Sequence, residues 1–132
     1  MSAFSELTTS DAIQSFFKSP SIRISEKVFA LKDELISIRR HLHRHPELSW
    51  REFSTTKYIM EYLRSVSAHC AEHIHISSGT TYEGRRVPTG VVALLKGGMD
   101  GQCVMLRADI DALPVTEQSG LPFASTSDGV AH

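Results

Sequence analysis

Three charged residues follow directly on an apolar run in the last third of the sequence. Arg107, Asp109 and Asp111 alternate with apolar residues after the run 103–106. Alternate residues of a strand share a face, so the two aspartates are expected to point the same way. Paired carboxylates can hold a metal ion, or can orient a histidine that holds one. The same pattern also fits a strand end with solvated charges and an Arg–Asp ion pair, and both interpretations stay open.

A second group of titratable side chains lies at a basic helix end. His41 and His45 are four residues apart, the spacing with which two helical histidines can share a zinc ion. No glutamate lies between them, and Pro46 distorts the last position. A basic helix terminus, where positive charge suits the helix dipole, is therefore the favoured interpretation.

Further zinc-type side chains lie close together at His69, Cys70, His73 and His75. Structural zinc sites use regular ligand spacings, which this group lacks, so surface and strand positions are favoured. Cys103 lies in an apolar run and is expected to be a buried structural thiol. The sequence contains no nucleophile elbow, phosphate loop or dinucleotide fingerprint.

Two amphipathic helices are expected to precede the charged segment. Residues 25–44 carry apolar side chains at three- and four-residue steps, which predicts one apolar stripe that ends before Pro46. A second helix is expected to start at Ser49. The Ser49 hydroxyl would cap this helix while Glu52 reaches back to the cap, as in a capping box.

The remainder of the chain has the pattern of strands. Residues 73–76 predict a short strand, and residues 77–88 a loop or hairpin. The apolar runs 91–95 and 103–106, joined by a glycine-rich turn, predict two antiparallel neighbouring strands, each buried on both faces. The charged group would then lie beyond the end of a core strand, where ligand sites of open α/β sheets gather. Helices followed by core strands indicate the α/β class.

Composition limits the kinds of partner. With 132 residues, 41% hydrophobic and 22% charged, the chain is expected to form one soluble globular domain. A net charge of -1 disfavours a nucleic-acid surface. No apolar run approaches the roughly 20 residues that span a bilayer, so no membrane partner is expected. Two isolated cysteines and an N-terminus without a signal-peptide pattern favour a cytoplasmic location.

Four segments, in the same order, resemble the motifs of one family of metal-dependent amidohydrolases. The family includes aminoacylases, hippurate hydrolases and auxin-conjugate (IAA-amino acid) hydrolases. The resembling segments are the opening motif at 38–49, the first core strand at 89–93, the LRADxDALP motif at 106–114 and the GLP-containing motif at 117–132. Residues 1–20 and 77–88 lie outside the resemblance.

The resemblance implies an α/β, zinc-peptidase-like catalytic domain with two divalent metal ions and a smaller inserted domain. The implied reaction is hydrolysis of the amide bond of an N-acyl amino acid, in which a metal-bound water attacks and a glutamate moves the proton. Asp109 matches the family's aspartate that supports the metal centre, and Arg107 and Asp111 belong to the same motif. Residues 1–24 are expected to be an N-terminal extension, and residues 25–132 the first part of the catalytic domain.

The family continues after the equivalent of His132 with Ala-Cys-Gly-His-Asp, which supplies metal-binding Cys and His side chains. We therefore expect no metal ligand in this chain, which would be inactive by itself as a fragment of a full-length hydrolase. A homo-oligomer is compatible with this view. The first alternative is a non-catalytic interaction module, or a degenerate gene product, that pairs with a full-length relative. The second is a histidine-rich protein that binds zinc through His41 and His45.

Overall fold

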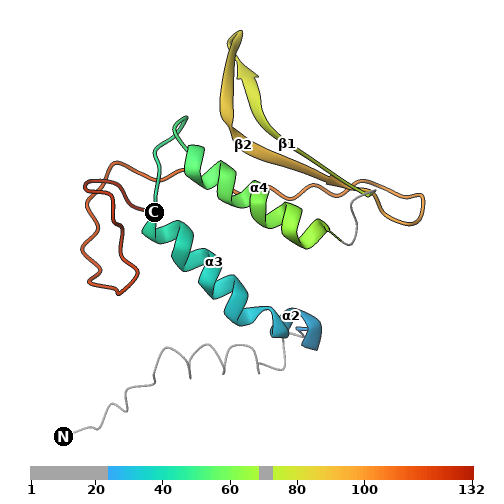
Figure 1. Ribbon diagram of the computed structural model, residues 1–132, viewed down its shortest axis with the longest axis horizontal. Helices are drawn as coiled ribbons and strands as arrows, with labels where there is room; N and C mark the ends of the chain where they lie inside the picture. The colour runs from blue at the N-terminus through green and yellow to red at the C-terminus, as the bar shows by residue number, and fades with distance from the viewer. Residues whose placement is uncertain (1–23, 69–72) are drawn as a thin grey trace, which may run out of the picture. The chain divides into compact units, whose positions relative to one another are not determined.

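A computed structural model describes residues 24–68 and 73–132. The chain divides into two compact units, residues 1–38 and 39–132. Along the chain the elements are α2 (Glu26–Ala30), α3 (Lys32–Arg44), α4 (Phe53–Ser67), β1 (Ile74–Tyr82) and β2 (Arg85–Leu95) (Figure 1). Helices followed by a sheet confirm the predicted α/β class.

The helix predicted over 25–44 is interrupted once, at Leu31. Ser25 caps α2 by accepting a hydrogen bond from the backbone N–H of Val28 at 3.3 Å. The N–H of Leu31 bonds the carbonyl of Val28, three residues back, at 3.1 Å. This tighter bond closes α2, and α3 starts at Lys32. The predicted stop before Pro46 is confirmed, because α3 ends at Arg44.

The predicted capping box at the start of α4 is wrong. The helix begins at Phe53, and its N-cap residue is Glu52, whose side chain makes no capping hydrogen bond. Trp50 lies between Ser49 and this N-cap with a φ of 67°. That left-handed backbone turns the chain before the helix, so Ser49 lies outside it.

Glu47 performs the capping that was expected of Ser49. Its Oε1 accepts the backbone N–H of Ser54 at 3.1 Å, and its Oε2 accepts that of Thr55 at 2.7 Å. These are free N–H groups of the first turn, where the helix dipole also favours a negative charge. Burial by itself would raise the pKa of Glu47, but these hydrogen bonds together lower it.

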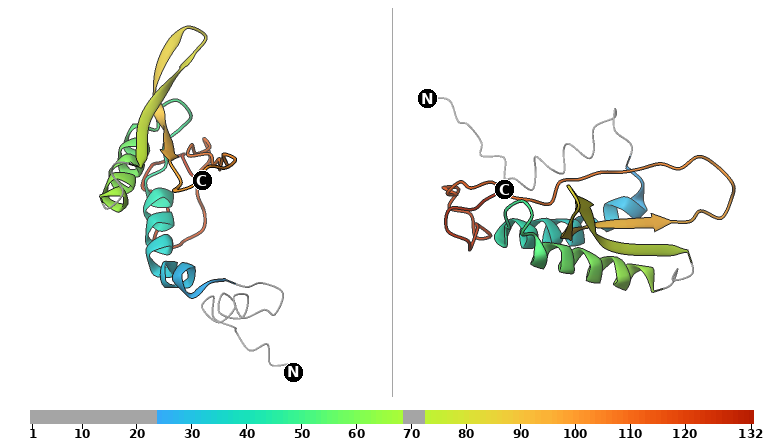
Figure 2. Two further views of the ribbon diagram at one scale, coloured as in Figure 1. Left: turned by 90° about the vertical axis from the view of Figure 1, so that its right-hand side faces the viewer. Right: turned by 90° about the horizontal axis from the view of Figure 1, so that it is seen from above.

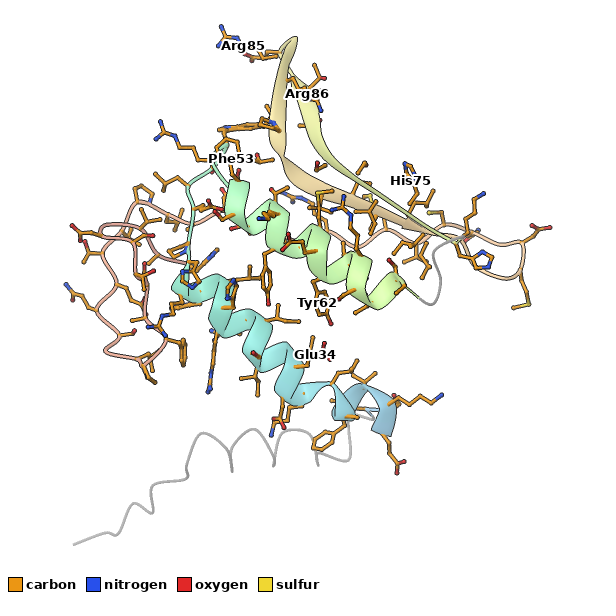
Figure 3. The ribbon with its side chains drawn as sticks, in the orientation of Figure 1. Glu34, Phe53, Tyr62, His75, Arg85 and Arg86 are labelled. Carbon is orange, nitrogen blue, oxygen red and sulfur yellow. The ribbon has the colours of Figure 1, made fainter. Side chains whose placement is uncertain are left out.

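The two strands form an antiparallel hairpin, which runs from the pair Ile74–Leu95 to the pair Tyr82–Arg85. The register shifts between Ser78 and Thr80, around Gly79 with a φ of 80°. The predicted loop or hairpin over 77–88 is therefore the far half of a hairpin. Arg85 and Arg86 lie at its far end (Figure 3).

Helix α4 packs against both strands of the hairpin, as Figures 1 and 2 show from three directions. One hydrogen bond ties the layers directly: the backbone N–H of Gly90 donates to Oγ1 of Thr56 at 2.9 Å. Thr56 is 5% exposed and Thr89, beside Gly90, is 6% exposed. The contact between this helix and the sheet therefore contains satisfied polar groups as well as apolar ones.

The prediction of a second buried strand at 103–106 is wrong for the described residues. No hydrogen-bonded neighbour lies beside this segment in the part of the chain that the structure describes, and Val104, Met105 and Leu106 are 83–93% exposed. Val92 and Leu95 of β2 are also exposed, at 65% and 66%. The strand that pairs with β2 is β1, and among the described residues the second edge of β2 has no partner strand. Within residues 24–68 and 73–132 no helix is both long and apolar enough to span a membrane.

Candidate functional site

Three chain segments from distant parts of the sequence meet around Ala112. Its N–H donates to the carbonyl of Glu47 at 2.8 Å, and a parallel bridge pairs it with Leu48. The next residue, Leu113, exchanges two backbone hydrogen bonds with Ala131, at 2.8 and 3.0 Å. Ala112 and Ala131 are 4% and 3% exposed. Side chains next to these alanines are therefore brought together by backbone pairing.

Asp111, directly before Ala112, is the charged residue next to these paired segments. The hydroxyl of Ser49 donates a hydrogen bond to its Oδ2. That hydrogen bond is the main cause that lowers the pKa of Asp111, and the charges of His132 and Arg107 lower it further. Asp111 is thus kept ionised, and its charge and that of His132 influence each other.

Arg107 and Asp109 form a separate pair in the exposed segment before the meeting point. Nη2 of Arg107 lies 2.6 Å from Oδ1 of Asp109, and the two side chains are 79% and 68% exposed. This is the solvated Arg–Asp pair left open by the sequence. In this geometry an exposed pair contributes little to stability, and Asp109 and Asp111 have different partners.

Sequence reasoning missed a part-buried hydrogen bond between Glu117 and His43. Oε1 of Glu117 lies 3.0 Å from Nε2 of His43, and the side chains are 11% and 15% exposed. The hydroxyl of Ser119, the N–H of Ser125 and the His43 ring, in that order, lower the pKa of Glu117 to about 2. The partners lie 74 positions apart, so no local spacing indicates the contact. His43 was visible only as one of several basic residues at a helix end.

His41 and His45 lie close together, and His45 also lies 3.4 Å from the hydroxyl of Thr126 through its Nδ1. Their ring centroids are 4.8 Å apart, and His41 stacks on Tyr58 at 4.1 Å. Burial, followed by the charge of His45, lowers the pKa of His41. His41 therefore packs against Tyr58 of α4, and His45 packs against His41.

The described residues do not fit a metal site. Nowhere in residues 24–68 and 73–132 do three or more His, Cys, Asp or Glu side chains form a group that could hold a metal ion. Of the zinc-type group, His69 and Cys70 lie outside the described residues. Cys103, expected to be buried, is an exposed free thiol, because its segment has no neighbouring strand among the described residues. We therefore derive no step through a metal ion from these residues.

No family model matches this chain. Curated relatives do match it: the chain spans about a quarter of their length, and the matches cover most of the chain. The chain is 46% identical over 103 residues to N-acetylcysteine deacetylase of Bacillus subtilis, which covers 78% of this chain and 24% of that protein. Thermostable carboxypeptidase 2 of Saccharolobus solfataricus is 39% identical over 110 residues, with coverages of 83% and 25%. N-acyl-L-amino acid amidohydrolase of Geobacillus stearothermophilus is 39% identical over 109 residues, with coverages of 83% and 26%.

A solved structure agrees with these relatives. A Bacillus subtilis protein described as a dinuclear metal binding peptidase from the M20 family superposes with a TM-score of 0.65 at 45% identity. The superposition covers 78% of this chain and 26% of that protein. The chain therefore belongs to the M20 family of metal-dependent amidohydrolases and peptidases, and its partial coverage fits an N-terminal part of such a protein.

Proposed function

We propose that the protein carrying this chain hydrolyses the amide bond of N-acyl amino acids with the help of divalent metal ions. In this proposal residues 25–132 supply the first part of the catalytic domain, and residues 1–24 are an N-terminal extension. The relatives named for N-acetylcysteine and N-acyl-L-amino acids favour this substrate class over peptides. The relative described as dinuclear favours two metal ions, whose ligands the described residues do not supply.

One observation of the fold carries the proposal. The segments that resemble the family's opening motif, its LRADxDALP motif and its GLP motif meet through backbone pairing around Ala112. Backbone pairing fixes positions more tightly than flexible side chains do, which suits residues that must orient reacting groups. Motifs that lie far apart in the sequence thus come together at one candidate site.

The roles that we assign to the charged residues follow from their surroundings. Asp111, held ionised by Ser49, supplies a fixed negative charge beside His132. Asp109 is assigned the supporting role at the metal centre, because a carboxylate that orients a ligand raises its basicity. Arg107 pairs with Asp109 and restrains it. Removal of such supporting partners typically costs about 10- to 100-fold in metal affinity or activity.

The experiment starts from the transcript. Its sequence across the codon for His132 defines the encoded protein, which is then produced and incubated with N-acetyl and longer N-acyl amino acids. We expect release of the free amino acid with a divalent metal ion, and its loss with a chelator. Absence of release from every N-acyl amino acid, by a folded protein supplied with zinc, manganese or cobalt, contradicts the proposal.

A second candidate function is a non-catalytic module that pairs with a full-length relative. Exposed apolar side chains in two neighbouring parts of the chain favour it: Val92, Leu95, Val104, Met105 and Leu106. Contiguous exposed apolar surface marks protein–protein contacts or poorly soluble chains. A stop codon directly after His132, with a soluble and cooperatively unfolding 132-residue product, would favour this candidate. Aggregation of that product would count against it.

A further inference from the structure

The chain closes a loop between Leu113 and Ala131, and we call residues 113–131 the closing loop. Its two ends are joined by the reciprocal hydrogen bonds of Leu113 and Ala131. Asp111 lies two residues before the loop and His132 directly after it. Whatever holds the closing loop in place therefore also sets where His132 lies relative to Asp111.

Glu117, inside the closing loop, takes part in hydrogen bonds with His43, Ser119 and Ser125. Its Oε1 lies 3.0 Å from Nε2 of His43 and also accepts from the hydroxyl of Ser119. Its Oε2 accepts the backbone N–H of Ser125 at 2.6 Å. One carboxylate thus ties both halves of the loop to a histidine of α3.

The end of α3 holds the same loop at further points. The backbone N–H and the hydroxyl of Thr126 both donate to the carbonyl of Arg44, at 2.9 and 2.8 Å. The ring of Phe123 lies edge-on to His43 at 5.6 Å and beneath the guanidinium of Arg40 at 4.8 Å. These contacts all lie within residues 39–132, and they leave His43 packed between Glu117 and Phe123.

The hydrogen bond to Glu117 decides which nitrogen of His43 carries a proton. An ionised carboxylate only accepts hydrogen bonds, and the pKa of Glu117 is lowered to about 2. Nε2 of His43 therefore carries the hydrogen, and Nδ1 is the nitrogen without a proton when the ring is neutral. The ring centroid of His43 lies 6.4 Å from that of His132.

We propose that Glu117 is a positioning residue, which fixes His43 and the closing loop and thereby holds His132 beside Asp111 at the candidate site. This proposal rests on the proposed function, because that function makes the surroundings of Asp111 a catalytic site. The chain of contacts runs from Ser49 to Asp111, past His132 and His43, and ends at Glu117. Its two ends are hydrogen-bonded carboxylates, so both histidines lie between fixed negative charges.

Glu117→Gln tests the proposal in the protein that carries this chain, at the length its transcript encodes. The amide keeps the shape but has one acceptor oxygen, so it cannot serve His43, Ser119 and Ser125 together. Selective 15N labelling of histidine reports the tautomers, with His43→Gln used to assign the resonances. We expect the Nε2–H preference of His43 to weaken, because a neutral amide oxygen is a poorer acceptor than a carboxylate, and the His132 resonances to shift.

The kinetic readout uses an N-acyl amino acid that the protein hydrolyses. Glu117→Gln is expected to lower kcat by about tenfold or more while KM changes by less than about threefold, as for a partner that orients a reacting group. Glu61→Gln is the matched control, because the same substitution is made at an exposed position. The side chain of Glu61 is 61% exposed, and its Oε1 lies 3.8 Å from Nζ of Lys57 on the same helix. The control is expected to leave both the resonances and kcat unchanged.

Unchanged His43 and His132 resonances together with an unchanged kcat in Glu117→Gln would overturn the positioning role. If this variant fails to fold, Ser119→Ala removes one donor to Glu117, and the same shifts are expected at smaller amplitude. A wild-type protein that hydrolyses no N-acyl amino acid contradicts the proposed function instead. In that case shifted His132 resonances in Glu117→Gln would still support the positioning of His132, and unshifted ones would overturn it.

Discussion

The hydroxyl of Ser49 donates a hydrogen bond to Oδ2 of Asp111, although the two residues lie 62 positions apart. This contact connects the turn before α4 with the segment that carries the charged motif. Ser49 does not cap the helix, because the left-handed turn at Trp50 places it outside α4, which starts at Phe53. The capping of α4 and the geometry around Asp111 depend on different side chains, those of Glu47 and Ser49, and each can be tested separately.

Replacement of Glu47 is expected to destabilise α4. Glu47→Ala removes the acceptor of the Ser54 and Thr55 N–H groups, and loss of a helix cap costs about 1–2 kcal/mol of unfolding free energy. Urea unfolding followed by circular dichroism measures the change. Ser49→Ala is the comparison: it removes only the exposed hydrogen bond to Asp111 and should cost less than Glu47→Ala. The reverse order of the two variants would reinstate the capping box.

Removal of the Ser49 hydroxyl is expected to raise the pKa of Asp111. The Ser49 hydrogen bond is the main cause of its lowered pKa, so Ser49→Ala should move that pKa back towards the ordinary value of 3.8. Carboxyl 13C chemical shifts followed against pH measure both values. An Asp111 titration that is the same in wild type and variant would show that the hydroxyl does not reach the carboxylate in solution.

Acid is expected to weaken the fold through Glu117. Its pKa is about 2 in the folded chain, below the ordinary value of 4.5, so between these pH values the unfolded chain binds a proton that the folded chain does not. The stability due to Glu117 is complete above about pH 4.5 and is lost as the pH falls towards 2. In urea unfolding at several pH values, Glu117→Gln should show a shallower loss across this window than Glu61→Gln. Parallel curves for the two variants would contradict this assignment.

The hairpin is expected to depend on Gly79. Its φ of 80° lies in the left-handed region, and a Cβ there would lie 2.7 Å from the carbonyl oxygen of Val87. Gly79→Ala should therefore cost about 1–2 kcal/mol for the backbone conformation, and more for the clash. Gly98→Ala is the control, because a Cβ at Gly98 would meet no atom within 4 Å. Equal thermal midpoints for both variants would show that the bulge at Gly79 is not rigid.

Local sequence patterns predicted the parts of the fold that depend on neighbouring residues. The apolar stripe of 25–44, the stop before Pro46 and the reversal within 77–88 all depend on short-range sterics and periodicity, and all three are present. The apolar run 91–95 was correctly predicted as a strand, but its partner was not. An apolar run carries no information about which other segment will hydrogen-bond to it.

The candidate site was predictable only in part, for the same reason. The motif that contains Asp109 and Asp111 was found from its charges, but the partners Ser49, His43 and Glu117 lie 62 to 74 positions from the residues they bind. Such contacts arise from the pairing of Leu48, Ala112 and Ala131, which no local pattern indicates. The capping box failed because the left-handed backbone of Trp50 places Ser49 outside the helix, which starts at Phe53.

The most direct test of the account is removal and return of metal during hydrolysis of an N-acyl amino acid by the protein that carries this chain. We expect dialysis against a chelator to abolish release of the amino acid, and a divalent metal ion to restore it. Asp109→Asn should lower the restored kcat/KM by roughly 10- to 100-fold while the protein stays folded. Hydrolysis that survives chelation, or that Asp109→Asn leaves unchanged, would contradict the account.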